Sequence, residues 1–94
     1  MIRVLVTERI RTTARQLPPE VREAVAKAIA EVGSAFGNPH QHRGLGLRKL
    51  ARRSYEIRVQ RQWRVAFVHD RDTLIAYDIM DHGGVALWLR AQRK

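Results

Sequence analysis

Two arginines are the first candidates for chemistry, because strand pairing predicts that their side chains face each other. Tyr55 to Val59 and Trp63 to Phe67 both alternate apolar and polar residues, as half-buried strands do. A three-residue loop, Gln60 to Gln62, pairs each apolar residue of one run with an apolar residue of the other. In that register, Arg58 lies directly opposite Arg64.

An arginine pair of this kind is a candidate binding site for a phosphate. Like charges at facing positions destabilise a sheet by some tenths of a kcal/mol, so folding alone does not favour the pair. The next run, Thr73 to Asp81, is expected to pair around a turn centred on Arg71, which sets Asp78 opposite Arg64. Two guanidiniums that share one carboxylate keep donors free for a phosphate, which a planar guanidinium binds with two hydrogen bonds. The alternative is that both arginines are solvated residues of an exposed sheet face.

The charge of the chain is strongly positive and unevenly distributed. The 94 residues contain 18 Lys and Arg against 9 Asp and Glu, which gives a net charge of +9. Residues 43–64 hold eight of the bases and a single acid, Glu56. A focused basic patch favours a polyanionic partner, first of all nucleic acid, or else an acidic protein.

Length and composition predict one small domain over residues 1–94. The chain has no cysteine, which excludes disulfides and thiolate metal sites and agrees with a reducing, cytoplasmic location. The four histidines lack zinc-ligand spacing beyond His40-x-His42, so we expect neither a metal nor another cofactor. The longest apolar run is far shorter than the ~20 residues that span a bilayer, so no membrane partner is expected.

The residues before these strands predict helices that cover the sheet. Residues 2–6 alternate like a first strand, and Thr7 can cap a helix over residues 8–17. Pro18-Pro19 ends that helix and begins another. The second helix carries an apolar stripe made of Val21, Ala24, Val25, Ala28, Ile29 and Val32.

We therefore expect an α/β (α+β) fold, in which a small, mainly antiparallel sheet packs on an N-terminal helical hairpin. Residues 40–46 are expected to form a polar loop, and residues 85–91 a short C-terminal helix. The apolar residues of that last helix, expected in the core, are Val85, Leu87, Trp88 and Leu89. The sheet residues expected to face the helices are Tyr55, Ile57, Val59, Trp63, Val65, Phe67, Ile75, Tyr77 and Ile79.

Several short motifs in this order resemble the RelE/ParE superfamily of toxin-antitoxin toxins. They are Leu47-Arg48-Lys49-Leu50, Tyr55 to Val59, Trp63 to Phe67 and Asp81-His82, and the likeness covers most of the chain. RelE members cleave mRNA, usually in the ribosomal decoding site, whereas ParE members inhibit DNA gyrase. The resemblance implies a cognate antitoxin as partner, mRNA and the ribosome as targets, and contact with DNA only through the antitoxin.

The resemblance also implies site residues for a metal-independent endoribonuclease. Cleavage of RNA by its own 2′-hydroxyl needs a base, positive charge at the phosphate, and an acid for the leaving oxygen. Matched by motif, the catalytic residues are Arg58, Arg64, His82 and Lys49. The bases expected to hold the RNA strand are Arg43, Arg48, Arg52, Arg53 and Arg61.

The chain departs from the family after Asp81-His82, where many members have a tyrosine. This chain has Gly83-Gly84-Val85-Ala86 there, and no arginine follows His82. His82 then acts as base or acid with less help, or is only a turn residue after the last strand. Three hypotheses remain: a RelE-like endoribonuclease toxin, a ParE-like gyrase inhibitor, and a catalytically weak relative that mainly binds its antitoxin.

Overall fold

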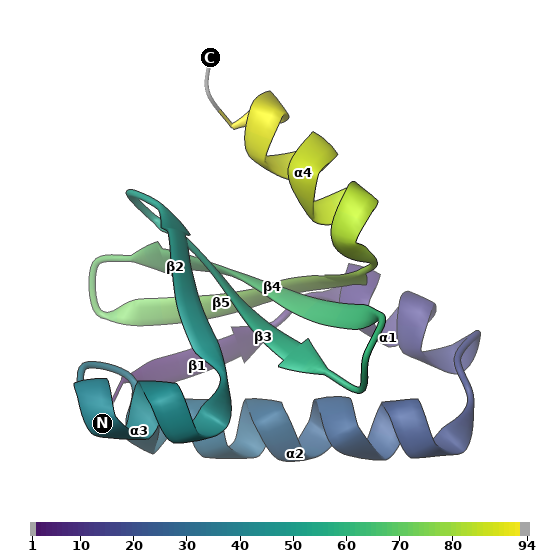
Figure 1. The fold of residues 1–94 in the computed structure, drawn as a ribbon, viewed down its shortest axis with the longest axis horizontal. Helices are drawn as coiled ribbons and strands as arrows, with labels where there is room; N and C mark the ends of the chain where they lie inside the picture. Colours follow the sequence, from purple (N-terminus) through teal and green to yellow (C-terminus); the bar gives the residue numbers. More distant parts are fainter. Residues whose placement is uncertain (1, 93–94) are drawn as a thin grey trace.

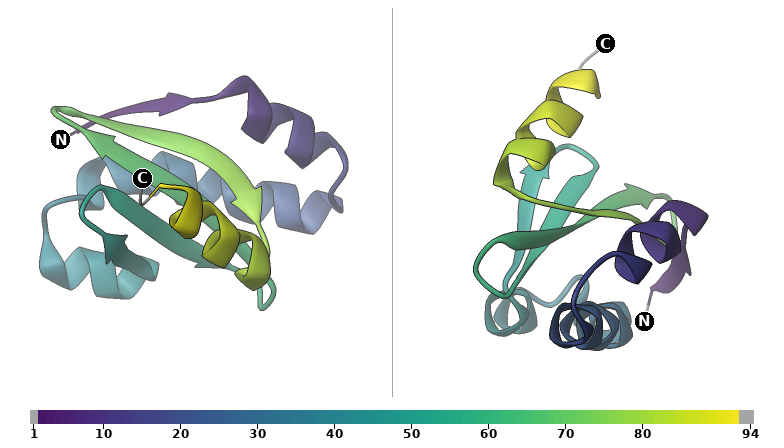
Figure 2. Two further views of the ribbon diagram at one scale, coloured as in Figure 1. Left: turned by 90° about the horizontal axis from the view of Figure 1, so that it is seen from above. Right: turned by 90° about the vertical axis from the view of Figure 1, so that its right-hand side faces the viewer.

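A computed structural model describes residues 2–92, in which a five-stranded sheet has helices on both faces (Figures 1 and 2). The elements in chain order are β1 (Arg3–Val6), α1 (Glu8–Arg15), α2 (Pro19–Ala35), α3 (Pro39–Leu45), β2 (Leu47–Ala51), β3 (Ser54–Val59), β4 (Trp63–Asp70), β5 (Thr73–Met80) and α4 (His82–Ala91). The strand order is β1-β5-β4-β3-β2, and only β1 pairs in parallel, with β5. The expected α/β class with a mainly antiparallel sheet is confirmed.

The first two helices begin where the sequence predicts. The Oγ1 atom of Thr7 accepts a hydrogen bond from the Ile10 N–H at 3.2 Å and so caps α1. Pro19 occupies the first turn of α2, where its missing N–H costs nothing. Figure 1 shows α2 running beneath the sheet, and its buried stripe is Val21, Val25, Ala28, Val32 and Ala35. No helix within residues 2–92, not even the 17-residue α2, is long and apolar enough to cross a membrane.

The pairing of β3 with β4 is the predicted one. Ile57 faces Val65, Tyr55 faces Phe67, and the loop of residues 60–62 sets Val59 against Trp63. The core lies between these strands and the helices, where Ile57, Val65 and Phe67 are at most 1% exposed.

The predicted register of β4 with β5 is wrong. Asp70 pairs with Thr73, so the turn has two residues and is one residue shorter than expected. A slip of one residue moves side chains to the other face of a sheet. Leu74 and Ala76 therefore lie in the core with the helices, whereas Ile75 and Tyr77 point to the opposite face.

A bulge then restores the original faces further along β5. The register shifts between Ala66 and Phe67, so that Val65 pairs with Ile79 and returns Ile79 to the core. The same shift sets Arg64 opposite Met80. The expected pairing of Arg64 with Asp78 is therefore also wrong.

The helix α4 covers part of the sheet face that points away from α2, which we call the outer face (Figure 2). Its buried residues Val85 and Trp88 pack on Ala66, and the Trp88 ring stacks on Tyr77 at 5.7 Å. The expected C-terminal helix is confirmed, but it begins earlier, at His82, because Asp81 accepts the Gly84 N–H at 2.7 Å and caps it. Leu87, expected in the core, is 64% exposed.

The segment expected to be a polar loop is instead a helix followed by an edge strand. Pro39 begins α3, and Gly46 ends it with φ at 81°, in the left-handed region that glycine adopts without strain. The Nε2 atom of His42 accepts the Gly37 N–H at 2.7 Å and so ties α3 to the end of α2. β2 then pairs with β3, which places Arg48 and Lys49 on a strand.

We predict that Phe67→Ala destabilises the protein by about 3–5 kcal/mol, because it leaves a cavity at a fully buried position. The control is Leu87→Ala, which should change the free energy of unfolding by less than about 0.5 kcal/mol because Leu87 is mostly exposed. Urea unfolding of the two variants measures both values. Equal losses would mean that α4 packs through Leu87 and that its placement on the outer face is wrong.

Candidate nucleic-acid interface

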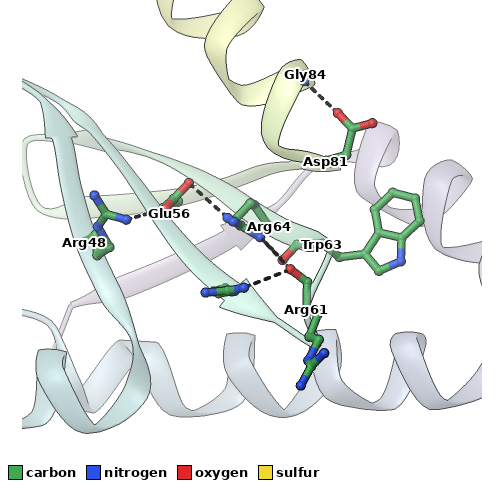
Figure 3. Close-up of polar contacts among 8 residues, drawn as sticks. Arg48, Glu56, Arg61, Trp63, Arg64, Asp81 and Gly84 are labelled. Carbon is green, nitrogen blue, oxygen red and sulfur yellow. Dashed lines mark hydrogen bonds and ion pairs between the residues drawn. The ribbon is translucent and has the colours of Figure 1, made fainter.

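Arg58 and Arg64 converge on one backbone carbonyl at the turn between β3 and β4. They face each other across the two strands, as predicted. The Nη2 atom of Arg58 donates to the Arg61 carbonyl at 3.3 Å, and the Nη1 atom of Arg64 donates to the same oxygen at 3.4 Å. Arg64 also donates to the Trp63 carbonyl at 3.3 Å (Figure 3). The Arg61 carbonyl thus brings two positive charges side by side.

The carboxylate beside this pair is Glu56. It lies on β3 opposite Ala66, on the outer face, and its side chain is 6% exposed. Its Oε1 atom is 3.7 Å from Nε of Arg64, and its Oε2 atom is 3.7 Å from Nη1 of Arg48. In Figure 3 the Glu56 carboxylate lies between these two guanidiniums.

Asp78, the expected partner of the arginines, is engaged elsewhere. Its Oδ1 atom accepts hydrogen bonds from Oγ1 of Thr13 at 2.7 Å and from the Ile79 N–H at 2.8 Å. These bonds tie β5 to α1. The predicted row of Arg58, Arg64 and Asp78 is thus corrected to one in which Glu56 supplies the carboxylate.

The two arginines differ in how strongly they are held. The Arg64 side chain is only 12% exposed, with Glu56 and two carbonyls around it, whereas Arg58 is exposed. Arg58 therefore presents its guanidinium to solvent, and Arg64 supplies a fixed charge beneath it. Arg48, on the edge strand β2, is 73% exposed and can move toward a ligand.

Not every base expected at the site lies near this pair. Lys49 faces Tyr55, which packs with the core on the helical side, so Lys49 lies on the opposite face from Arg58 and Arg64. Arg43 belongs to α3, on the helical side as well (Figure 2). The structure does not bring either residue to the outer face.

Two other bases lie at the far end of β3. Arg52 and Arg53 form the turn between β2 and β3, and the Arg53 carbonyl accepts the His69 N–H at 2.8 Å. At about 3.3 Å per residue, Arg53 is roughly 17 Å along the strand from Arg58. The two groups could contact the same extended strand of nucleic acid but not the same phosphate.

His82 lies at the start of α4, at the end of the strand that pairs with Arg64. Arg64 faces Met80, and His82 follows two residues later as an exposed residue. Within residues 2–92 its ring forms no hydrogen bond with another protein group. The ring is therefore free to meet a ligand that approaches the outer face at this end of the sheet.

Glu56 is the site residue whose place the sequence did not reveal. Its type and position were visible, because it is the single acid of residues 43–64. Its burial was not visible, because burial depends on tertiary packing, and an arginine from each neighbouring strand lies beside its carboxylate. Among residues 2–92, no three His, Asp or Glu side chains gather closely enough to hold a metal ion.

Comparisons with known proteins identify the fold. No protein-family model and no curated protein matches the chain. A chain of the RelB–RelE antitoxin-toxin complex from Methanococcus jannaschii superposes with a TM-score of 0.67 and 18% identity, over 87% of this chain and 94% of that one. For the RelE–RelB complex from Pyrococcus horikoshii OT3 the values are 0.68 and 14%, over 87% and 96%.

The isolated RelE toxin of E. coli gives a TM-score of 0.63 at 14% identity, over 97% of this chain and 99% of the toxin. The match therefore includes nearly the whole of both chains. The chain has the fold of the RelE toxins.

We predict that Arg58→Gln and Arg64→Gln affect stability differently. Arg58 is exposed, so its loss should change the free energy of unfolding by less than about 0.5 kcal/mol. Arg64→Gln leaves the buried Glu56 without its inner partner and should destabilise by about 1–3 kcal/mol. Urea unfolding tests this, and a larger loss for Arg58 would contradict the burial of Arg64.

Proposed function

We propose that this chain is the toxin of a type II toxin-antitoxin system and a metal-independent endoribonuclease that cleaves mRNA, at the ribosome, to stop translation. The observation that carries the proposal is the convergence of Arg58 and Arg64 on one carbonyl. Folding gains nothing from that repulsion, but a phosphate bound there would relieve it. The fold that this chain shares with the RelE toxins also supports the proposed function.

The outer face can serve each requirement of RNA cleavage by the 2′-hydroxyl. Arg58 and Arg64 neutralise the phosphate as its charge rises in the transition state. His82 transfers a proton, as base or as acid. Arg48 and Arg61 bind the neighbouring backbone, and Arg52 and Arg53 bind it further along.

Lys49 and Arg43 have a different role in this proposal from Arg58 and Arg64. Both lie away from the outer face. We assign them to contacts with more distant RNA or with the ribosome, and we assign no proton transfer to Lys49. Their charge would then add to affinity and to its salt dependence without changing the chemical step.

The proposed partner is a cognate antitoxin. Two of the similar structures are RelB–RelE complexes, which supports a partner of this kind. A chain with net charge +9 is best neutralised by an acidic protein segment, and a segment that folds on binding can cover a large surface. DNA contact would come through the antitoxin only.

Induced expression in cells tests the proposal. We predict growth arrest with rapid cleavage of mRNA and without a DNA damage response, and rescue of growth by the co-expressed antitoxin. DNA damage without mRNA cleavage would support gyrase inhibition instead. Full growth of cells that contain folded protein would contradict a toxin.

We predict that Arg58→Gln lowers RNA cleavage by about a hundredfold or more, the scale for losing one transition-state donor. Arg64→Lys should also fail, because an ammonium cannot reproduce the planar guanidinium. The matched control is Arg22→Gln, an exposed arginine of α2 on the helical side, which should retain activity. Equal losses in Arg58→Gln and Arg22→Gln, with full activity in Arg64→Lys, would mean that overall charge, and not this pair, determines activity.

A further inference from the structure

We propose that Glu56 is the catalytic base, which accepts the proton of the RNA 2′-hydroxyl, and that His82 is left to protonate the leaving oxygen. The proposal rests on the endoribonuclease function proposed above. Glu56 is a buried carboxylate, 5% exposed, in the middle of the basic face. Buried charges are costly unless their hydrogen bonds are satisfied.

The carboxylate of Glu56 has unused capacity to accept hydrogen bonds. Both of its ion pairs are at 3.7 Å, which is longer than a hydrogen bond. Within residues 2–92 the structure shows no hydrogen bond from a protein donor to either oxygen, and neither oxygen is among its fully buried unpaired polar atoms, so solvent reaches both. With 6% of the side chain open to solvent, a substrate hydroxyl is a donor that fits.

Glu56 is also correctly placed relative to the phosphate site. Glu56 and Arg58 are two residues apart on one strand, so they share a face at a spacing of about 7 Å. Arg64, from the neighbouring strand, reaches both sites: it faces Arg58 across the strands, and its Nε approaches Glu56. A nucleotide whose phosphate lies on the two arginines can direct its 2′-hydroxyl toward Glu56.

The step balances without any other reactant. The O2′–H bond breaks and its proton passes to the Glu56 carboxylate, while O2′ forms a bond to phosphorus. The P–O5′ bond breaks, and O5′ takes a proton from His82. The products are a 2′,3′-cyclic phosphate and a 5′-hydroxyl.

Proton transfer to Glu56 also changes the charge around Arg64. The ionised carboxylate attracts the Arg64 guanidinium at 3.7 Å. Once protonated, Glu56 no longer does so, and the phosphorus centre carries an additional negative charge at the same moment. The Arg64 guanidinium then interacts less with Glu56 and more with the negatively charged transition state, which it stabilises.

A purely positioning role for Glu56 makes a different prediction from a base. Glu56→Gln keeps the shape of the side chain and an oxygen that can face Arg64, but it removes the basic group. Glu56→Asp keeps a base on a shorter side chain. If Glu56 only positions Arg64, Glu56→Gln should retain more activity than Glu56→Asp; if it is the base, the order should reverse.

The test compares two RNA substrates that differ at one atom. In the first the leaving atom is O5′, and in the second it is sulfur, which needs no proton to leave. Each is presented to the purified full chain, free and on a programmed ribosome. We expect Glu56→Gln to lower kcat by about a hundredfold to a thousandfold on both substrates, with KM within about threefold of the unmodified protein.

His82→Ala should show the opposite dependence on the leaving atom. It should be slow with oxygen and recover to within about tenfold of the unmodified protein with sulfur. Asp78→Asn, which removes one negative charge from the same sheet outside the site, should cleave both substrates normally if it remains folded. Melting curves identify any variant that has lost its fold.

Three results would overturn the assignment. They are cleavage by folded Glu56→Gln within about tenfold of the unmodified protein, recovery of Glu56→Gln by the sulfur substrate, and a rise in KM that accounts for the whole loss. A different result would overturn the proposed function itself: the unmodified chain would bind RNA and cleave neither substrate, free or on the ribosome.

Discussion

The pairing of β3 with β4 is the constraint on which the rest of the structure depends. It buries Ile57, Val65 and Phe67 under the helices, and strand alternation then fixes Arg58 and Arg64 on the outer face. Each buried side chain contributes about 1.5–3 kcal/mol, far more than the repulsion of one pair of facing charges costs. The core therefore holds the arginines in place, and the Arg61 carbonyl brings their guanidiniums together.

The fold could be predicted wherever only one register buries an apolar face. That holds for β3 and β4, where apolar and polar residues alternate. It does not hold for β5, because Leu74 and Ala76 on one side are as apolar as Ile75 and Tyr77 on the other. There the length of the turn and a bulge decide the register, and neither has a clear signal in the sequence.

The candidate site could be predicted only in part, for the same reason. The arginine pair follows from two strands with clear alternation. The sheet face on which Lys49 lies could not be predicted in this way, because it depends on β2, an edge strand that the sequence did not indicate. The burial of Glu56 depends on how β2 and β4 pack beside β3, which is tertiary packing that no local pattern encodes.

The central claim is that Arg58 and Arg64 act on one phosphate, and a double-mutant cycle measures that directly. The kcat/KM for RNA cleavage is compared for the unmodified chain, Arg58→Gln, Arg64→Gln and the double variant. If both guanidiniums bind the same phosphate, the double variant should lose much less than the product of the single losses, with a coupling of about 1 kcal/mol or more. Losses that simply multiply would show that the two arginines act at separate places and would contradict the account.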